Sequence, residues 1–356
     1  MSRDRTKTIA ERAVGVGVLA GAVLAPTFVN DFWVDGILIQ TFVLGTVAAS
    51  MIFLSAYGGM ISLSQLALMG ITGYLLGNMV SQRVPGGETK GLTLGWDPTL
   101  SLILAVLFAT IIGLILGAVA SRSFGIYFLM LTLVYAVIAN LFFGSVTQFG
   151  GFSPIAGIWQ YTPGFVGDIV NDRQRLYYIA LVVALVSYVL IRYLVRTPFG
   201  ISLQGVRDEP TRMASLGYNV ALHRTLAFGF AAFIASLAGV VYVWWAGQIA
   251  PGDIGLLPTI QLLIIAVIGG LSRIEGAWLG AFTFIVIENY VRDVAVPILG
   301  GSFNTVIGFI FLAIVIVSPD GLMGLWDRVW DAARRRGGPP LEPAELEQPV
   351  VGTSSA

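Results

Sequence analysis

The stretch TPFGISLQGVRDEPTRMASLGYNVALHRTLAFGFAAFIASLAGVVY (residues 197–242) joins a charged segment to a long apolar one. Its charges gather at Arg207, Asp208, Glu209 and Arg212, and an apolar segment then runs over residues 225–246. An apolar run of about 20 residues is long enough to cross the hydrocarbon core of a bilayer as a helix. The stretch therefore predicts a membrane-spanning helix preceded by a charged segment outside the bilayer.

The same pattern extends over the whole chain. Its 356 residues are 56% hydrophobic and 11% charged, and the mean hydropathy is +0.84, which is typical of a polytopic membrane protein. Apolar segments lie near residues 13–30, 37–56, 60–80, 99–120, 125–146, 176–195, 225–246, 258–271, 276–291 and 303–318. We therefore expect an all-α polytopic transmembrane helix bundle with about ten spans, in which the segments starting at 258 and 276 are short and broken or re-entrant.

The distribution of positive charge predicts the orientation. With a cytoplasmic N-terminus, most of the 20 lysine and arginine residues fall in cytoplasmic segments, as the positive-inside rule requires. We therefore expect a basic cytoplasmic N-terminus (1–12), a transmembrane domain (13–324) with a cytoplasmic loop at 196–224, and a disordered cytoplasmic tail (325–356). The first apolar segment also has the composition of a signal peptide, but the many spans after it favour an uncleaved span.

The charged loop carries the boundary signals of a short helix. Pro210 suits the first helical position and Gly217 suits the position just past the end. A helix of about two turns is marginal in water, so it needs a surface to lie on. Met213 and Leu216 share a face that fits a partner's groove, while Arg207 and Arg212 can reach partner carboxylates. The alternative is an ordinary solvated loop.

Polar side chains within the spans are candidates for a translocation path. If residues 60–80 form a helix, Ser62, Gln65 and Thr72 share one stripe and a neighbouring stripe is made of Gly70, Gly73 and Gly77. The polar stripe predicts either an aqueous path or hydrogen bonding between packed helices. Glu288 is the one carboxylate inside a proposed span, and it either contacts substrate or pairs with Arg292 at a hydrated helix end. A repeat of small residues, Gly229, Ala232, Ser236 and Gly239, predicts close packing of the span after the loop.

The chain lacks the residues that several classes of function require. The chain has no cysteine and one histidine, His223, which excludes a cluster with metal-ligand spacing, and a net charge of zero argues against nucleic acid as a partner. The phosphate-binding pattern G-x-x-x-x-G-K-[ST] is missing, so energy must come from a partner or a gradient. A single intramembrane carboxylate disfavours an ion-coupled secondary transporter, and the lack of clustered catalytic side chains disfavours a membrane enzyme.

Four stretches together resemble one known family, the LivM-type permease subunits of branched-chain amino acid ABC importers. They are GGMISLSQLALMGITGY (58–74), FGIYFLMLTLVYAVI (124–138), the 197–242 stretch, and VIGGLSRIEGAWLGAF with SPDGLMG. They occur in the family's order over most of residues 45–324. The chain departs from the family where many members read S-L-G-H, because it has Ser62, Leu63, Ser64 and Gln65 there, and this weakens a borrowed substrate assignment.

The resemblance implies an ABC importer permease in a bacterial cytoplasmic membrane, with no cofactor and no catalytic residue of its own. It implies a second permease subunit (a heterodimer), two cytoplasmic ATP-binding subunits and an extracytoplasmic substrate-binding protein as partners. It assigns residues of the loop to the contact with the ATP-binding subunits: Arg207, Asp208, Glu209, Arg212, Ala214 and Gly217. The implied substrates are leucine, isoleucine and valine, with urea, short amides or other amino acids as alternatives.

Overall fold

A computed structural model of the chain describes residues 20–81, 91–164, 166–167, 169 and 172–299, with isolated positions at 15, 17, 308–309, 312 and 321–324. Residues 20–28, within the first expected span, are helical. The expected basic N-terminus (1–12), nearly all of the last expected span (303–318) and the expected tail (325–356) lie outside the described residues.

The described part of the chain is built from long apolar helices. Five are long and apolar enough to cross a membrane: α2, η1 and α3 as one continuous rod (Asp31–Trp33, Val34–Leu38, Ile39–Gly58), α5 (Pro98–Ala120), α6 (Ile126–Ser145), α7 (Arg173–Arg196) and α10 (Val220–Ala246). Two shorter apolar helices are α4 (Gln65–Val80) and α11 (Leu256–Gly269), and α12 spans Gly276–Leu299. The expected all-α polytopic membrane bundle is confirmed.

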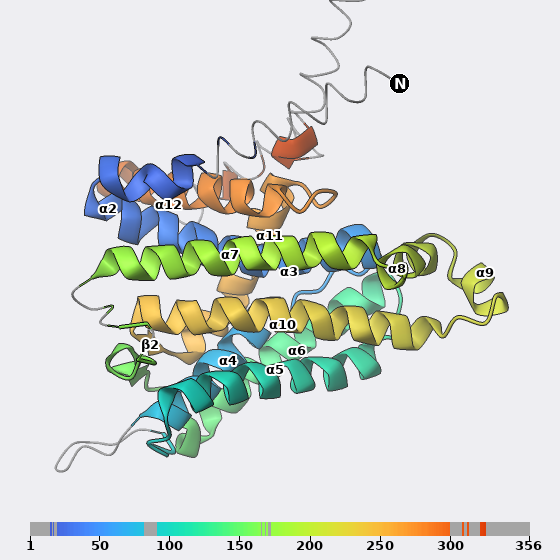
Figure 1. The fold of residues 1–356 in the computed structure, drawn as a ribbon, viewed down its shortest axis with the longest axis horizontal. Helices are drawn as coiled ribbons and strands as arrows, with labels where there is room; N and C mark the ends of the chain where they lie inside the picture. The colour runs from blue at the N-terminus through green and yellow to red at the C-terminus, as the bar shows by residue number, and fades with distance from the viewer. Residues whose placement is uncertain are drawn as a thin grey trace, which may run out of the picture.

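Helix α10 lies at the centre of the bundle. It packs on α3, α4, α5 and α7, and Figure 1 shows α7 and α10 running side by side along the long axis. In their most apolar stretches 78% of the α2–α3 rod and 72% of α10 are buried, against 28% of α5 and α6 and 22% of α7. The outer helices therefore expose apolar side chains, as lipid-facing helices do.

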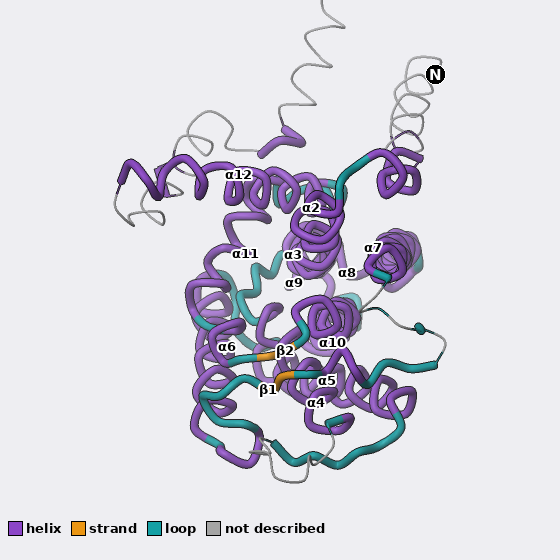
Figure 2. Tube along the Cα trace, turned by 90° about the vertical axis from the view of Figure 1, so that its left-hand side faces the viewer, coloured by secondary structure: helices purple, strands orange, loops and turns teal. Residues whose placement is uncertain are grey.

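The two ends of the bundle carry different short elements. At one end, α8 (Pro198–Asp208) and α9 (Pro210–Ser215) follow α7, and Figure 1 shows α9 beyond the end of α10; we call this the α8–α9 end. At the other end, strand β1 (Ile155–Ala156) pairs antiparallel with β2 (Gln248–Ile249); we call this the ladder end. Short helices η2 (Thr147–Phe149), η3 (Ile158–Gln160) and η4 (Pro251–Ile254) complete the ladder end, which faces the viewer in Figure 2.

Local sequence signals place the helix boundaries. The Asp97 carboxylate accepts hydrogen bonds from the backbone N–H groups of Thr99 and Leu100 ahead of α5, and the Asn219 side chain accepts one from Leu222 ahead of α10. Gly59 (φ +64°) ends α3 and Gly247 (φ +71°) ends α10, both in the left-handed conformation that glycine adopts without strain. These cap residues thus fix where α5 begins, where α3 ends, and where α10 begins and ends.

Two expected spans differ from the structure. The segment 60–80 is not one helix, because Gly59 ends α3 and the chain stays irregular until α4 begins at Gln65. This interruption lies inside the protein, since residues 62–74 are all buried, and irregular backbone is tolerated at membrane depth when protein surrounds it. Helix α11 is short, as predicted, whereas α12 continues past the expected end at 291 to Leu299.

Candidate functional site

The charged loop at 196–224 forms two helices at the α8–α9 end. Helix α9 begins at Pro210, ends at Ser215 and is followed by Gly217 at φ +89°, so the predicted helix and both of its boundary residues are confirmed. Helix α8 was not predicted. It starts at a Thr197 cap, whose hydroxyl accepts a hydrogen bond from the Gly200 N–H, and it buries Leu203 and Val206 against the bundle. The loop is therefore a helical elbow with a buried arm and an exposed arm.

Arg207, at the elbow, turns inward and fastens α8 to α3. Its guanidinium donates a hydrogen bond to the Ala56 carbonyl in the last turn of α3 and lies 2.7 Å from the Asp208 carboxylate through Nε. The hydrogen bond from Arg207 lowers the pKa of the exposed Asp208. The expectation that Arg207 reaches a partner carboxylate remains a prediction, and in this structure the side chain is committed to its own chain.

The exposed arm presents most of the remaining predicted residues. Glu209, Arg212 and Ala214 are exposed, and the Leu216 side chain is 66% exposed. Met213, by contrast, packs back onto α8. Its sulfur lies so close to Gly205 that a Cβ added to this glycine would be only 2.9 Å away from it. Arg212 on α9 and Leu216 just after it are therefore long side chains open to a partner here, while Met213 packs against α8.

Ser62 and Gln65 belong to a buried polar network where α3 passes into α4. The Gln65 amide donates to the Ser62 hydroxyl (3.3 Å) and accepts from the Ser50 hydroxyl (3.2 Å), and Ser62 lies 3.0 Å from the Ser64 hydroxyl. All four side chains are fully buried. A buried amide is stabilised only when its polar atoms are paired, and these groups pair with one another. The structure thus brings two of the predicted path residues together.

Thr72 does not join this network. The shared stripe predicted for Ser62, Gln65 and Thr72 is wrong, because Ser62 precedes the first residue of α4 and so has no helical register with Thr72. Thr72 is buried, donates to the Leu68 carbonyl of its own helix at 3.1 Å, and lies at the crossing of α4 with Gly239 of α10. Glu288 is half-buried and lies on α12, a different helix from those that meet at the α3–α4 junction.

The glycine stripe of α4 receives a cluster of isoleucines from the ladder end. A Cβ on Gly70 would overlap Ile254, one on Gly73 would lie 3.3 Å from Ile249, and one on Gly77 would lie 3.0 Å from Ile158 and 3.4 Å from Ile155. We call Ile155, Ile158, Ile249 and Ile254 the isoleucine plug; all four are at most 2% exposed. The neighbours of the stripe are thus side chains, from the connecting segments and, at Gly73, also from Val243 of α10, which would lie 2.7 Å from an added Cβ.

Backbone pairing holds the isoleucine plug in place. Ile155 pairs with Ile249 and Ala156 with Gln248 in the β1–β2 ladder, and the N–H groups of Gly157 and Ile158 both donate to the Gly247 carbonyl, at 3.0 and 3.3 Å. The two connections thus form one body that lies over α4 (Figure 2). Sequence reasoning missed this body, because two-residue strands have no periodicity to detect.

Asp253 is a second feature that the sequence did not indicate. Its carboxylate accepts a hydrogen bond from the Ala250 N–H at 2.8 Å and one from the Tyr242 hydroxyl, and burial raises its pKa. The neighbouring Tyr74 hydroxyl is buried and has no hydrogen-bond partner within the described residues. On sequence alone Asp253 lies in a connection between spans, and the Pro-Gly-Asp turn is the only signal that marks it. Within the described residues, no group of three or more potential metal ligands is present.

Comparison with known proteins identifies relatives of the chain. A family model described as "Branched-chain amino acid transport system / permease component" matches residues 33–318. The high-affinity branched-chain amino acid transport system permease protein LivM of Escherichia coli (strain K12) is 25% identical over 248 residues, which are 62% of this chain and 56% of that protein. The chain thus covers little more than half of that relative's length.

Two further relatives have similar descriptions. The permease protein BraD of Pseudomonas aeruginosa, from a high-affinity branched-chain amino acid transport system, is 30% identical over 159 residues, 44% of this chain and 50% of that protein. A probable branched-chain amino acid transport permease protein LivH of Methanocaldococcus jannaschii is 25% identical over 260 residues, 68% of this chain and 81% of that protein. No solved structure matches the chain.

Proposed function

We propose that this chain, which belongs to the branched-chain amino acid transport system permease family, is the membrane-spanning subunit of an ATP-binding-cassette importer for leucine, isoleucine and valine. The observation that carries the proposal is the helical elbow. Helix α9 extends beyond the bundle with Arg212 and Leu216 exposed, while Arg207 fastens its supporting helix α8 to the end of α3. Because α8 is bonded to α3, a force on the exposed face of α9 is transmitted to α3 as a rigid-body movement.

The proposed partners follow from this arrangement. Two ATP-binding subunits on the cytoplasmic side contact α9, a second permease subunit completes the membrane domain as a heterodimer, and an extracytoplasmic binding protein delivers the amino acid. Because the chain lacks a phosphate-binding loop, hydrolysis belongs to the partners and this subunit catalyses no reaction. Relatives described as LivM and as LivH both match the chain, which supports pairing of two related permeases.

The proposed orientation places the α8–α9 end in the cytoplasm. The described arginines near that end are Arg122, Arg192, Arg196, Arg207, Arg212, Arg224 and Arg273, whereas Arg173 and Arg175 begin α7 at the ladder end. This asymmetry follows the positive-inside rule and supports cytoplasmic N- and C-termini. The transmembrane domain then spans 13–324, with the N-terminal segment (1–12) and the tail (325–356) on the cytoplasmic side.

The proposed path runs between the two ends beside α4. The buried network of Ser62, Gln65 and Ser50 lies beside this path, and once its internal hydrogen bonds open it would offer uncharged polar contacts, which suit a zwitterion that must bind and leave. On the extracytoplasmic side the isoleucine plug closes access along the glycine stripe of α4. Transport requires the plug and the elbow to move alternately, with Glu288 and Thr72 as further candidates along the route.

The proposal is tested in vesicles that contain this chain with its partner permease, ATP-binding subunits and binding protein. Leucine or valine is expected to stimulate ATP hydrolysis and to be taken up, whereas urea and a short amide are not. Stimulation by urea or the amide alone would reassign the substrate. Uptake driven by an ion gradient without the ATP-binding subunits would contradict the importer assignment.

The coupling surface is tested by the double variant Arg212→Glu with Gly217→Val. The first change reverses the exposed charge, and the second places a β-branched residue at φ +89° in otherwise open space, so the end of α9 is distorted. We expect normal membrane insertion and loss of uptake. The matched control is Arg122→Glu, which reverses an exposed arginine at the same end outside the elbow and should leave uptake intact. Normal uptake in the double variant would contradict the assignment of α9.

A further inference from the structure

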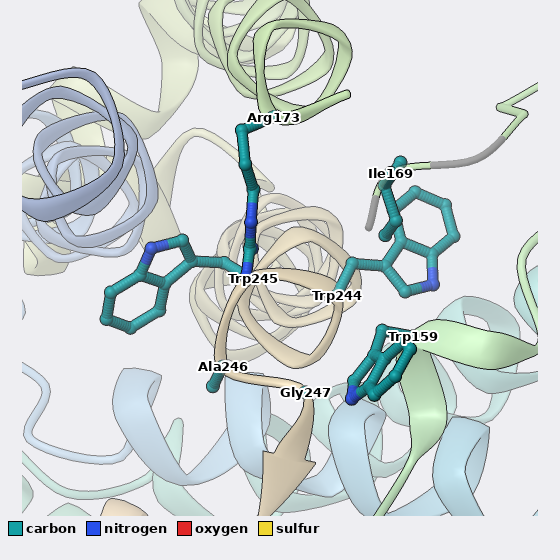
Figure 3. A pocket seen from close by; sticks show the side chains of 7 residues that line it. All are labelled: Trp159, Ile169, Arg173, Trp244, Trp245, Ala246 and Gly247. Carbon is teal, nitrogen blue, oxygen red and sulfur yellow. The ribbon is translucent and has the colours of Figure 1, made fainter. Parts of the chain in front are cut away.

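A hollow of about 190 Å³ opens at the ladder end, where α7 begins and α10 ends. Figure 3 shows its lining, in which the Arg173 side chain reaches from α7 toward Trp244 and Trp245 while Trp159 lies beside Gly247. This volume is below the roughly 300–1,000 Å³ of pockets for drug-sized ligands. The hollow therefore suits a small ligand with an apolar part.

The tryptophans are fixed before any ligand arrives. A Cβ on Gly247 would overlap the Trp159 ring, so this glycine, at φ +71°, is what allows the ring to lie there. Trp245 Nε1 donates a hydrogen bond to the Asp35 carbonyl at 2.9 Å, and Trp244 is 3% exposed. The ring walls thus need little ordering when a ligand binds, which favours affinity.

Arg173 joins the hollow to a second depression, where it and Asp35 form an incompletely paired cation and anion. That depression, of about 560 Å³, is lined by Arg173 and by three carboxylates, Asp31, Asp35 and Asp172, of which Asp172 is paired with Arg175. Arg173 Nη1 lies 3.7 Å from Asp35 Oδ1, which is too long for a hydrogen bond. Asp35 Oδ1 is buried and accepts no hydrogen bond from the described residues. The Asp35 side chain as a whole is 41% exposed, so a donor supplied from outside can reach the carboxylate and pair with it.

The neighbouring ion pair differs in this respect. Arg175 Nε lies 2.6 Å from Asp172 Oδ2, so these two side chains already satisfy each other. Among the described residues of the ladder end, Arg173 and Asp35 are thus a pair in which each charged group can still bond a ligand.

We propose that Arg173, Asp35 and the tryptophan-lined hollow form an extracytoplasmic receiving site for a zwitterionic α-amino acid with a branched aliphatic side chain. The guanidinium of Arg173 binds the carboxylate, the Asp35 carboxylate accepts from the ammonium, and the side chain enters between Trp159 and Trp244. Charge-assisted hydrogen bonds fix the orientation, and the aromatic walls exclude ligands that lack an apolar group. The proposal rests on the function proposed above, since it names where the transported amino acid first meets this subunit.

The test measures equilibrium binding of radiolabelled valine to the full chain in phosphatidylcholine nanodiscs, without binding protein or nucleotide. Two competitors each lack one charge: isovalerate has no ammonium and isobutylamine has no carboxylate. For the unaltered chain we expect valine to compete best, each single-charge analogue to compete at least about tenfold more weakly, and glycine to compete poorly. Equal competition by valine and isobutylamine, or by valine and glycine, would overturn the site.

Variants assign the two charges. Arg173→Gln should weaken valine binding about tenfold or more and leave isobutylamine binding unchanged, while Asp35→Asn should weaken valine and leave isovalerate unchanged. Arg175→Gln is the matched control on the same helical turn and should bind valine normally. Valine binding that is unaltered in both variants, or equally weakened in Arg175→Gln, would overturn the proposal. The competition by analogues is measured on the unaltered chain, so it tests the site even if a variant fails to fold.

Two further outcomes distinguish an amino acid site from a lipid site, and the site itself from the importer function. Phosphatidylethanolamine also carries an anionic and a cationic group, so loss of valine binding in nanodiscs of that lipid would show a lipid headgroup as the occupant and overturn the proposal. Specific valine binding without ATP-driven uptake in the complete system would contradict the importer function and leave this site standing. Uptake without measurable valine binding by this chain would contradict the proposed site and leave the importer function standing.

Discussion

Arg224 shows how one side chain joins three segments at the α8–α9 end. It is 3% exposed, with Nη1 donating to the Ser121 carbonyl at 2.9 Å and Nε 3.1 Å from the Met60 sulfur. Its guanidinium carbon lies 4.2 Å from the centre of the Phe124 ring and 5.4 Å from that of Phe128. Ring faces and a backbone carbonyl thus replace the water that a buried cation loses.

We predict that Arg224→Ala lowers the thermal stability of the purified chain. The variant loses a hydrogen bond from a charged donor and the ring contacts, which costs on the order of 2 kcal/mol or more. Arg224→Lys should not restore stability, because an ammonium cannot stack and bond the carbonyl as a planar fork does. The midpoint of thermal unfolding in detergent measures both variants. Arg196→Ala, an exposed arginine at the same end, is the control, and equal losses in the two alanine variants would refute the packing role of Arg224.

At the scale of single elements, α10 depends on small residues for its neighbours to approach. The predicted packing role of Gly229, Ala232, Ser236 and Gly239 is confirmed at three positions: Gly229 faces Leu114, Ala232 faces Gly113, and Gly239 faces the Met69 carbonyl of α4. Within a bilayer, close contact between helices supplies the attraction that apolar burial supplies in water. Small residues at these crossings are therefore a condition for the bundle to form.

Two glycine substitutions in α10 should differ although they add the same methyl group. Gly239→Ala forces the methyl into a backbone carbonyl, which cannot move without shifting α4, so we expect overpacking to cost about 1–3 kcal/mol and lower the unfolding midpoint by several degrees. Gly229→Ala meets Cδ2 and Cγ of the Leu114 side chain, which can change rotamer without moving any backbone, so we expect a smaller loss than in Gly239→Ala. Thermal unfolding of both variants decides the matter, and a larger loss in Gly229→Ala would show that the α4–α10 crossing is loose.

Of the two helices in the elbow, the sequence predicted α9 but not α8. Helix α9 was predicted because Pro210 and Gly217 mark its two ends within a few residues. Helix α8 has comparable signals, a Thr197 cap followed by Pro198, and two apolar residues three apart, Leu203 and Val206. Because the segment also contains polar residues, its sequence predicted part of a loop. Its buried side depends on α3, which is far away in sequence, and no local pattern reports that contact.

At the scale of the whole molecule, two bodies lie at opposite ends of the bundle. The isoleucine plug covers the glycine stripe of α4 at the ladder end, and the elbow is fastened to α3 at the α8–α9 end. Helices α4 and α10 run between these ends (Figures 1 and 2), so a push on the elbow has a packed route to the plug. Alternating access of the proposed kind needs β1 and β2 to separate, so that the isoleucine plug can leave the glycine stripe of α4.

Cross-linking the ladder should therefore stop transport. Ala156 and Gln248 are exposed register partners in the antiparallel pair, and the chain has no native cysteine, so Ala156→Cys with Gln248→Cys introduces a single disulfide without disturbing the plug itself. We expect oxidation to block uptake and dithiothreitol to restore it. Each single cysteine variant should be insensitive to oxidation. Full uptake in the oxidised double variant, with the cross-link verified by mass spectrometry, would show that the ladder stays closed during transport.

The sequence by itself determined that this chain is a multi-pass helical membrane protein, which family it belongs to, and where α9 begins and ends. These properties follow from hydropathy over about 20 residues and from cap residues next to each helix, which are short-range signals. Only the tertiary structure decided that Arg224 is buried, that Gln65 bonds Ser50, that Arg207 turns inward, and that four isoleucines meet the glycines of α4. Those contacts join residues far apart in the chain, and between apolar helices in lipid they depend on the fit of side chains rather than on any hydrophobic period.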